Sequence, residues 1–387
     1  MTCLPDYDGG GIANLMASLI AGLGGKQGDL PAASLLHPDE LSAYRNVVLM
    51  VLDGLGDNLL QASKEAAWLN RHRRGRLTSV FPPTTATAIT TYLTGEPPSR
   101  HGLTGWHMYF RELGSVVAVL PCRPRFGGAT LGEAGVSVAT LLNHVPLYDR
   151  LAVPSHVLSP AYIAGSDFNL AHLGGAALHA FESWQELLSQ VSQLAREADS
   201  RRFIYGYWPK LDGLGHEQGI GSESVKEHLA MLDAGLSALA GELAGSGTLL
   251  IVTADHGQID TTDADRIDLD DHPELARTLA LPLCGESRAA YCYVRAGMEA
   301  AFENYVFDRL AHAAALHRSA DLIAQGWFGP GAPHPRLHER AGDYVLVMKE
   351  HYVIKDWLPQ ERRHTLVGVH GGITADEMHV PLVTASL

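Results

Sequence analysis

The chain has 387 residues, of which 46% are hydrophobic, and its formal net charge of −14 repels long polyanions, so we expect no stable nucleic-acid complex. The apolar stretch 12–23 is too short and too glycine-interrupted to cross a bilayer, and no basic segment precedes it as in a secretory signal, so we expect no membrane segment and a cytoplasmic location. Only four cysteines occur, irregularly spaced and without a C-x-x-C pair, which predicts reduced thiols and no disulfide framework.

Apolar runs alternate with helical patterns along the chain. Residues 46–52, 115–120, 202–208 and 248–253 are typical of strands buried on both faces of a parallel sheet. Residues 184–195, 223–243 and 299–316 have helical patterns, and residues 342–357 indicate two strands that meet at a turn. This alternation predicts an α/β fold, with a central, mostly parallel sheet and helices on both faces. We expect a single catalytic domain over residues 1–387, with cap-like insertions near 110–200 and 261–340, where no strong motif occurs.

Acidic residues and histidines follow several of these runs. Asp53 and the pair Asp255-His256 come almost directly after predicted strands, where functional side chains of parallel sheets collect. Taken alone, each motif is ordinary, because an Asp-Gly pair is usually a turn and an Asp-His pair is usually a solvated loop. As a set, however, they form the nitrogen and oxygen ligands of two adjacent zinc-like ions. The set is Asp53, Asp212, His216, Asp255, His256 and His370.

The spacing within the motifs supports this interpretation. Asp212 and His216 are four residues apart, which places both side chains on one face if the segment is helical. Asp255 and His256 are adjacent and converge only on an irregular backbone, which Gly257 permits.

A threonine-rich turn, FPPTTATAITTYLTG, follows the first motif. A hydroxyl is a poor nucleophile at neutral pH and needs activation, which a bound divalent cation would provide. If a helix begins near Thr85, its free amides would face an anion. The alternative is that Thr84, Thr85 and Thr87 are only capping and turn residues, and Thr84 is a second candidate for the nucleophile.

With these motifs, the chain resembles the alkaline phosphatase superfamily, and within it the nucleotide pyrophosphatase/phosphodiesterase branch, over residues 46–382. Thr94-Gly95 and the Pro98–His101 turn set the register, in which the resemblance makes Thr85 the catalytic nucleophile. The resemblance also divides the ligands between two divalent ions, zinc by ligand type with manganese as the alternative. One ion is held by Asp212, His216 and His370, and the other by Asp53, Asp255, His256 and Thr85 itself.

The chain departs from the family pattern beside the nucleophile. Ala86 stands where the family often has an aromatic residue that stacks on a base, and Trp106 stands where an asparagine usually donates to a phosphate oxygen. The identity of that donor is therefore open. We consider Trp106, His107 and Tyr205 as substrate-binding residues, with ordinary core packing as the alternative.

These features predict a two-metal hydrolase of small phosphoric esters, most directly a nucleotide phosphodiesterase or pyrophosphatase that forms a covalent threonine intermediate. The alternatives are a phosphonate hydrolase or phosphomonoesterase of the same superfamily, and a phosphoryl transferase or mutase. A non-catalytic binding protein is a further alternative, but it would be expected to lack a ligand or the nucleophile. No Asp-Ser-Ala nucleophile of the monoesterase type is present, which favours diesters.

Overall fold

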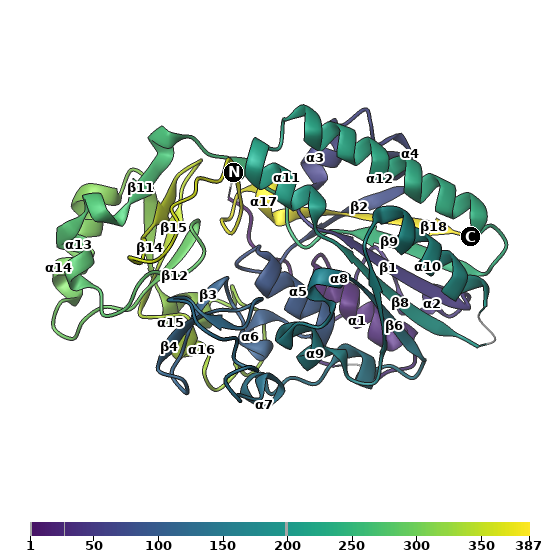
Figure 1. Ribbon diagram of the computed structural model, residues 1–387, viewed down its shortest axis with the longest axis horizontal. Coiled ribbons are helices and arrows are strands. Elements are labelled where there is room, and N and C mark those ends of the chain that lie inside the picture. The colour runs from purple at the N-terminus through teal and green to yellow at the C-terminus, as the bar shows by residue number, and fades with distance from the viewer. Residues whose placement is uncertain (1, 27, 198–199) are drawn as a thin grey trace.

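The computed structural model describes residues 2–26, 28–197 and 200–387. A larger lobe is built on a seven-stranded sheet and a smaller lobe on a second seven-stranded sheet (Figure 1). In the main sheet β18 runs antiparallel to both β2 and β9, and the other neighbours are parallel. Its strands, in spatial order, are β2 (Arg73–Thr78), β18 (His379–Ser386), β9 (Thr248–Thr253), β1 (Asn46–Leu52), β8 (Arg202–Trp208), β6 (Ser155–Pro160) and β7 (Ala177–Phe181).

Strand β1 lies at the centre of this sheet, as suits a sequence that is apolar from Val47 to Leu52. All seven of its residues are buried, as the continuous hydrophobic run predicts. It pairs in parallel with β8 on one side and β9 on the other, and Val51 lies opposite Tyr207 in the β8 register. The carboxyl ends of these three strands therefore meet at one edge of the sheet.

Helices cover both faces of the main sheet, which confirms the predicted fold class. Helices α10 and α12 pack together on one face, and α1 and α5 pack together on the other (Figure 1). The helices of the larger lobe are α1 (Ile12–Gly22), α2 (Pro38–Leu41), α3 (Asp57–Ala62), α4 (Ala67–His72), α5 (Thr85–Thr94), α6 (Pro98–His101), α7 (Val138–Leu142), α8 (Ala161–Ala164), α9 (Asp167–Leu173), α10 (Trp184–Arg196), α11 (Lys210–Gln218), α12 (Glu223–Glu242) and α17 (Ala375–Met378).

The second sheet is antiparallel at every pair of neighbours. Its spatial order is β14 (Ala314–Arg318), β15 (Tyr344–Met348), β13 (Ala289–Cys292), β12 (Cys284–Gly285), β3 (His107–Phe110), β4 (Ser115–Ala118) and β5 (Arg123–Pro124). Helices α13 (Pro273–Thr278), α14 (Glu299–Tyr305), α15 (Ser319–Ala324) and α16 (Leu337–Arg340) belong to the same lobe (Figure 1). Two short ladders join β10 (Ile259–Asp260) to β17 (Gly368–Val369) and β11 (Arg266–Asp268) to β16 (Val353–Lys355).

The segments in which cap-like insertions were expected contribute strands to both sheets. Residues 107–124 and 284–348 supply the second sheet, whereas β6 and β7, which lie within residues 110–200, belong to the main sheet. Without a motif in these segments, the sequence offered no sign of where the chain passes from one sheet to the other.

Two predicted elements were wrong in part. Residues 115–120 do contain a strand, β4, but it joins the antiparallel sheet and two of its four residues are only half-buried. The helix expected over residues 299–316 gives way to a π-helical turn over Val306–Leu310, and Ala314–Arg318 form β14 beside β15. Pairing with a buried neighbouring strand here outweighs the helical propensity of the alanines.

Strands were correctly expected within residues 342–357, but β15 and β16 pair with other strands and not with each other. The four cysteines are free thiols, and three of them are buried. None of the helices in the described ranges is both long enough and apolar enough to cross a membrane.

Candidate active site

Three neighbouring strands bring three carboxylates to one edge of the main sheet. Asp53 follows β1 directly, and Asp255 lies two residues beyond the end of β9. Asp212 lies in the first turn of α11, which begins shortly after β8 ends. Because β8, β1 and β9 are adjacent and parallel, the three side chains converge, as the strand-end rule predicts.

The first group of candidate ligands is Asp212, His216 and His370, whose ligand atoms all lie within 4.8 Å of one another. The segment of Asp212 and His216 is helical, and His216 Nε2 lies 3.2 Å from Asp212 Oδ2. His370, just beyond β17, places its Nε2 4.0 Å from Asp212 Oδ1. Burial opposes ionisation of Asp212, but the charge and hydrogen bond of His216 outweigh it and lower the pKa of this carboxyl.

The second group is Asp53, Asp255 and His256, whose ligand atoms also lie within 4.8 Å of one another. His256 Nε2 is 3.4 Å from Asp53 Oδ1 and 3.4 Å from Asp255 Oδ2, and all three residues are buried. The rings of His256 and His370 stack with their centroids 3.8 Å apart, so the two groups adjoin.

The orientation of the three histidines suits metal binding. Each Nδ1 lies within hydrogen-bond distance of a backbone carbonyl oxygen, which can only accept, so each Nδ1 carries the proton. In the neutral ring each Nε2, which faces the carboxylates, is then free to bind a cation, the arrangement that orients imidazole ligands in metal sites. The acceptors are the carbonyl oxygens of Gly368, Gly257 and Pro83, at 2.7, 3.1 and 3.2 Å from His216, His256 and His370 respectively.

A bound cation would stabilise the buried carboxylates. Among the described residues, Asp53 Oδ1 and Asp255 Oδ2 are buried and have no hydrogen-bond partner. Burial, followed by the charges of Asp255 and Asp212, raises the pKa of the Asp53 carboxyl well above its usual range. A divalent cation between these oxygens would offset their repulsion and desolvation. The mixed imidazole and carboxylate donors fit zinc, and they also tolerate manganese.

Thr85 is the first residue of α5, and its side chain faces the second group. Its Oγ1 lies 3.2 Å from His256 Nε2. The amides of Thr85 and Ala86, in the first turn, have no acceptor within the described ranges, so they are available to an anion. The hydroxyl of Thr84 instead donates to Glu286, and Thr87 is completely buried.

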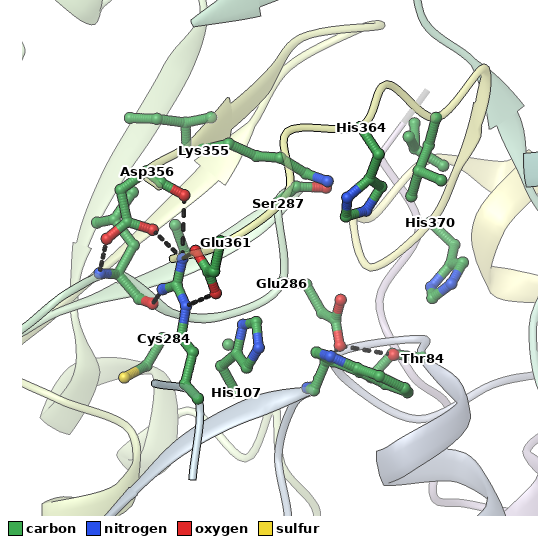
Figure 2. A pocket seen from close by; sticks show the side chains of 18 of the residues that line it. Thr84, His107, Cys284, Glu286, Ser287, Lys355, Asp356, Glu361, His364 and His370 are labelled. Carbon is green, nitrogen blue, oxygen red and sulfur yellow. Dashed lines mark hydrogen bonds and ion pairs between the residues drawn. The ribbon is translucent and has the colours of Figure 1, made fainter. Parts of the chain in front are cut away.

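A cavity of about 560 Å³ extends from Thr85 and His370 toward the second sheet (Figure 2). Of the three residues considered for substrate binding, Trp106, which is 37% exposed, and His107 line this cavity. Burial is the main cause that lowers the pKa of His107 to about 3. Tyr205 does not line the cavity. It is 2% exposed and its hydroxyl has no hydrogen-bond partner in the described part of the chain, so it is a core residue.

Three polar neighbours of the site were not found from the sequence. Tyr207 donates a hydrogen bond to Asp53 Oδ2, and Gln258 donates to the carboxylate and the carbonyl oxygen of Asp212. Tyr207 could have been suspected from its position, because it is the penultimate residue of β8 and so lies next to the strand end where the carboxylates gather. Tyr205 lies two residues earlier in the same strand. Glu286, which accepts from Thr84, comes from a segment without any motif.

The far end of the cavity is rich in charge. Arg125 is neutralised by Asp356 and Glu361, with shortest ion-pair distances of 2.8 Å to each. The Lys355 ammonium has no hydrogen bond or ion pair with any described residue; it lies 5.5 Å from the centroid of the Trp357 ring. The side chain extends toward Ser287 (Figure 2).

Solved structures share this fold. Murine ectonucleotide pyrophosphatase / phosphodiesterase 5 superposes with a TM-score of 0.64 at 18% identity, covering 87% of each chain. An inactive variant of that mouse protein, with one threonine replaced by alanine and in complex with AMP, gives a TM-score of 0.63. Phosphonoacetate hydrolase from Sinorhizobium meliloti 1021, in complex with phosphonoacetate, gives 0.65 at 17% identity, covering 88% of this chain and 90% of that one.

A comparison with curated proteins finds no match. The sequence model of the type I phosphodiesterase / nucleotide pyrophosphatase family, in contrast, matches residues 47–373, which include every candidate ligand and Thr85. With that match and the shared fold, the chain belongs to the type I phosphodiesterase / nucleotide pyrophosphatase family and is a metal-dependent hydrolase of phosphoryl esters.

Proposed function

We propose that the protein hydrolyses small phosphodiesters or nucleotide pyrophosphates through a covalent intermediate on Thr85. The observation that carries this proposal is the position of the Thr85 hydroxyl. It lies 3.2 Å from His256 Nε2, at the start of α5, beside two groups of candidate metal ligands.

In this proposal, Asp53, Asp255 and His256, together with Thr85, hold one divalent ion, and Asp212, His216 and His370 hold the other. Two such ions would activate the hydroxyl nucleophile and water, and would stabilise the charge that develops on the attacking and leaving oxygens. Zinc is the preferred ion because imidazole nitrogen supplies half of the six side chains, with manganese as the alternative.

The chain itself positions the reacting groups. Thr85 Oγ1 forms a bond to phosphorus as the bond to the leaving oxygen breaks, and the hydroxyl proton passes through solvent to that oxygen, which departs as an alcohol or a phosphate. The free amides of Thr85 and Ala86 donate to a phosphoryl oxygen. Water then attacks the phosphothreonyl ester, which frees the phosphate product and restores the threonine hydroxyl.

The ligands of the similar structures support a small phosphorylated substrate. The inactive mouse variant was solved with AMP, which supports a nucleotide and an essential threonine. The bacterial structures were solved with phosphonoformate and phosphonoacetate, which makes a phosphonate the second candidate substrate.

A substrate comparison tests the proposal. Rates on bis(p-nitrophenyl) phosphate, p-nitrophenyl phosphate and a phosphonate monoester are measured on one sample whose zinc and manganese contents are known. We expect the diester to react fastest, with activity lost on chelation and restored by added zinc or manganese. A strong preference for the monoester would overturn the assignment as a diesterase, and turnover that survives complete removal of metal would overturn the metal-dependent mechanism.

A further inference from the structure

Trp106 stands at the family's asparagine position, and it lines the cavity. The indole of Trp106 is 37% exposed, and its backbone N–H donates to Glu286 Oε1 at 2.7 Å. The position that would normally supply a hydrogen-bond donor to phosphate therefore anchors a carboxylate instead.

The carboxylate of Glu286 is anchored through one oxygen only. Oε1 also accepts from Thr84 Oγ1 at 2.7 Å. Oε2 has no hydrogen-bond partner among the described residues, and Figure 2 shows it pointing away from Thr84. The cavity thus has a bare carboxylate oxygen on its wall, beside the residue that precedes Thr85.

The backbone around Glu286 is held firmly. The turn between β12 and β13 closes through paired backbone hydrogen bonds between Glu286 and Ala289, at 3.0 and 3.1 Å. Two residues from Glu286, Arg288 forms a completely buried ion pair with Glu377. A Cβ at Gly371 would come within 2.8 Å of the Glu286 Cβ, so this side chain packs directly against the loop that follows His370. The start of the side chain is thus fixed against that loop, and the carboxylate itself is held through the two hydrogen bonds to its Oε1.

This arrangement has a consequence for the charge of the substrate. A phosphodiester group carries one negative charge, whereas a phosphomonoester above neutral pH carries two. Like charges a few ångströms apart in a partly desolvated cavity repel strongly. Lys355 also lines the cavity, and its charge interacts with that of Glu286, since burial lowers the pKa of Lys355 and the Glu286 charge opposes this. No ion pair joins the two described side chains, so Lys355 does not neutralise this carboxylate by contact.

We propose that Glu286 is a specificity-determining residue, whose unpaired carboxylate oxygen penalises a dianionic phosphoryl group and so disfavours phosphomonoesters relative to diesters. This inference rests on the proposed function for the position of the phosphoryl group. It assigns to the second sheet a role in substrate selection that none of the sequence motifs indicates.

The test compares wild type with Glu286→Gln, which keeps the shape and removes the charge. The kcat/KM values for bis(p-nitrophenyl) phosphate and p-nitrophenyl phosphate, which share a leaving group, are measured well above pH 7. Burial raises the pKa of Glu286 to about 7, so the wild-type carboxyl is ionised under these conditions. We expect the diester-to-monoester ratio to fall about tenfold or more in the variant. A ratio within about twofold of wild type would overturn the proposal.

A binding measurement gives a readout that does not need turnover. Calorimetric affinities for phenylphosphonate, a dianion, and for its monomethyl ester, a monoanion, are compared on zinc-loaded protein. The variant should gain affinity for the dianion alone, and equal gains for both ligands would contradict the proposal. If wild type hydrolyses no ester, the proposed function fails while this measurement still decides the role of Glu286.

Two matched variants separate charge selection from other effects. Glu361→Gln removes a carboxylate from the same cavity, but one that is paired with Arg125, and should leave the diester preference unchanged. Thr84→Val removes one anchor of Glu286 while keeping its charge, and should also preserve the preference. A loss of preference in Glu361→Gln equal to that in Glu286→Gln would indicate a general charge effect, and an equal loss in Thr84→Val would indicate that Glu286 only positions Thr84. Either result would overturn the proposal.

Discussion

His256 Nε2 and Thr85 Oγ1 lie 3.2 Å apart although 171 positions separate them in the sequence. His256 follows the end of β9, and Thr85 begins α5, so the fold of the main sheet creates this contact. The hydroxyl that the family resemblance identifies as the nucleophile therefore lies at the edge of the buried ligand group, and the account of the site depends on this pair.

Asp255→Asn tests the ligand assignment. The amide keeps the size of the side chain but removes the charge, so we expect the protein to lose about one metal equivalent and kcat/KM to fall about 100-fold or more. Elemental analysis and diester hydrolysis on the same sample measure both. Asp263→Asn, at a 94% exposed side chain, is the control and should change neither quantity. Full metal content in Asp255→Asn would remove this residue from the ligand set.

Tyr207→Phe tests the support of Asp53. The tyrosine hydroxyl donates to Asp53 Oδ2, and loss of such a bond to a ligand typically reduces metal affinity or activity about 10- to 100-fold. Tyr205→Phe is a matched control on the same strand, because the Tyr205 hydroxyl has no partner among the described residues. Metal titration of both variants measures the effect, and equal affinities would contradict the role of Tyr207.

Arg288→Met tests the connection between the second sheet and the loop that carries His370. Arg288 and Glu377 form a two-pronged ion pair at 2.8 and 3.0 Å, with both side chains fully buried. Removing Arg288 leaves the buried charge of Glu377 without its partner, so we expect the free energy of unfolding to fall by about 3–5 kcal/mol. Denaturant unfolding measures it, and the double variant with Glu377→Gln should recover part of the loss. A single variant as stable as wild type would show that the pair contributes nothing.

A cluster of buried histidines predicts how stability depends on pH. Burial, as the main cause, lowers the pKa of His144 to about 3 and that of His172 to about 4, and the two rings are hydrogen-bonded at 2.9 Å. These pKa values are lower in the folded state than the ordinary value of about 6.5. At any pH between the folded-state value and the ordinary value, the unfolded state therefore binds more protons than the folded state. Stability is therefore complete above about pH 6.5 and is lost as the pH falls, by up to about 1.4 kcal/mol per histidine and pH unit.

The test measures the free energy of unfolding of wild type and His144→Gln, both treated with chelator, between neutral and mildly acidic pH. The variant should lose less stability on acidification than wild type, because one of the suppressed protonations has been removed. The exposed His364, at the cavity rim, provides a control, since His364→Gln removes a histidine from outside the buried cluster and should follow the wild-type slope. If the free energy of unfolding of His144→Gln fell with pH as steeply as that of wild type, the histidine cluster would not be the origin of the acid sensitivity.

Most of the two candidate ligand groups could be found from the sequence because their residues follow features that the sequence encodes locally. Asp53 and Asp255 lie at the ends of apolar strands, and the spacing of Asp212 and His216 matches one helical turn. The neighbours from the second sheet could not be predicted in this way. Glu286 reaches Thr84 across 202 positions, and no local periodicity marks such a contact.

The substrate side was harder to predict for a physical reason. Aromatic residues near a strand end are equally compatible with a core and with a pocket wall, so residue type alone does not separate Tyr205 from Tyr207. Their depth along β8 decides the outcome, since Tyr207 contacts Asp53 while Tyr205 lies in the core. Likewise, the strand over residues 314–318 depends on its pairing with β15, a tertiary contact.

The most direct test of the central claim uses Thr85→Ala. Wild type and variant are loaded with zinc, assayed on the diester, quenched in acid during turnover and analysed by mass spectrometry for phosphate on residue 85. We predict that wild type carries phosphothreonine at this position, and that the variant retains its metal and its fold but has no activity above background. Near-normal turnover in Thr85→Ala, with metal bound, would contradict the account.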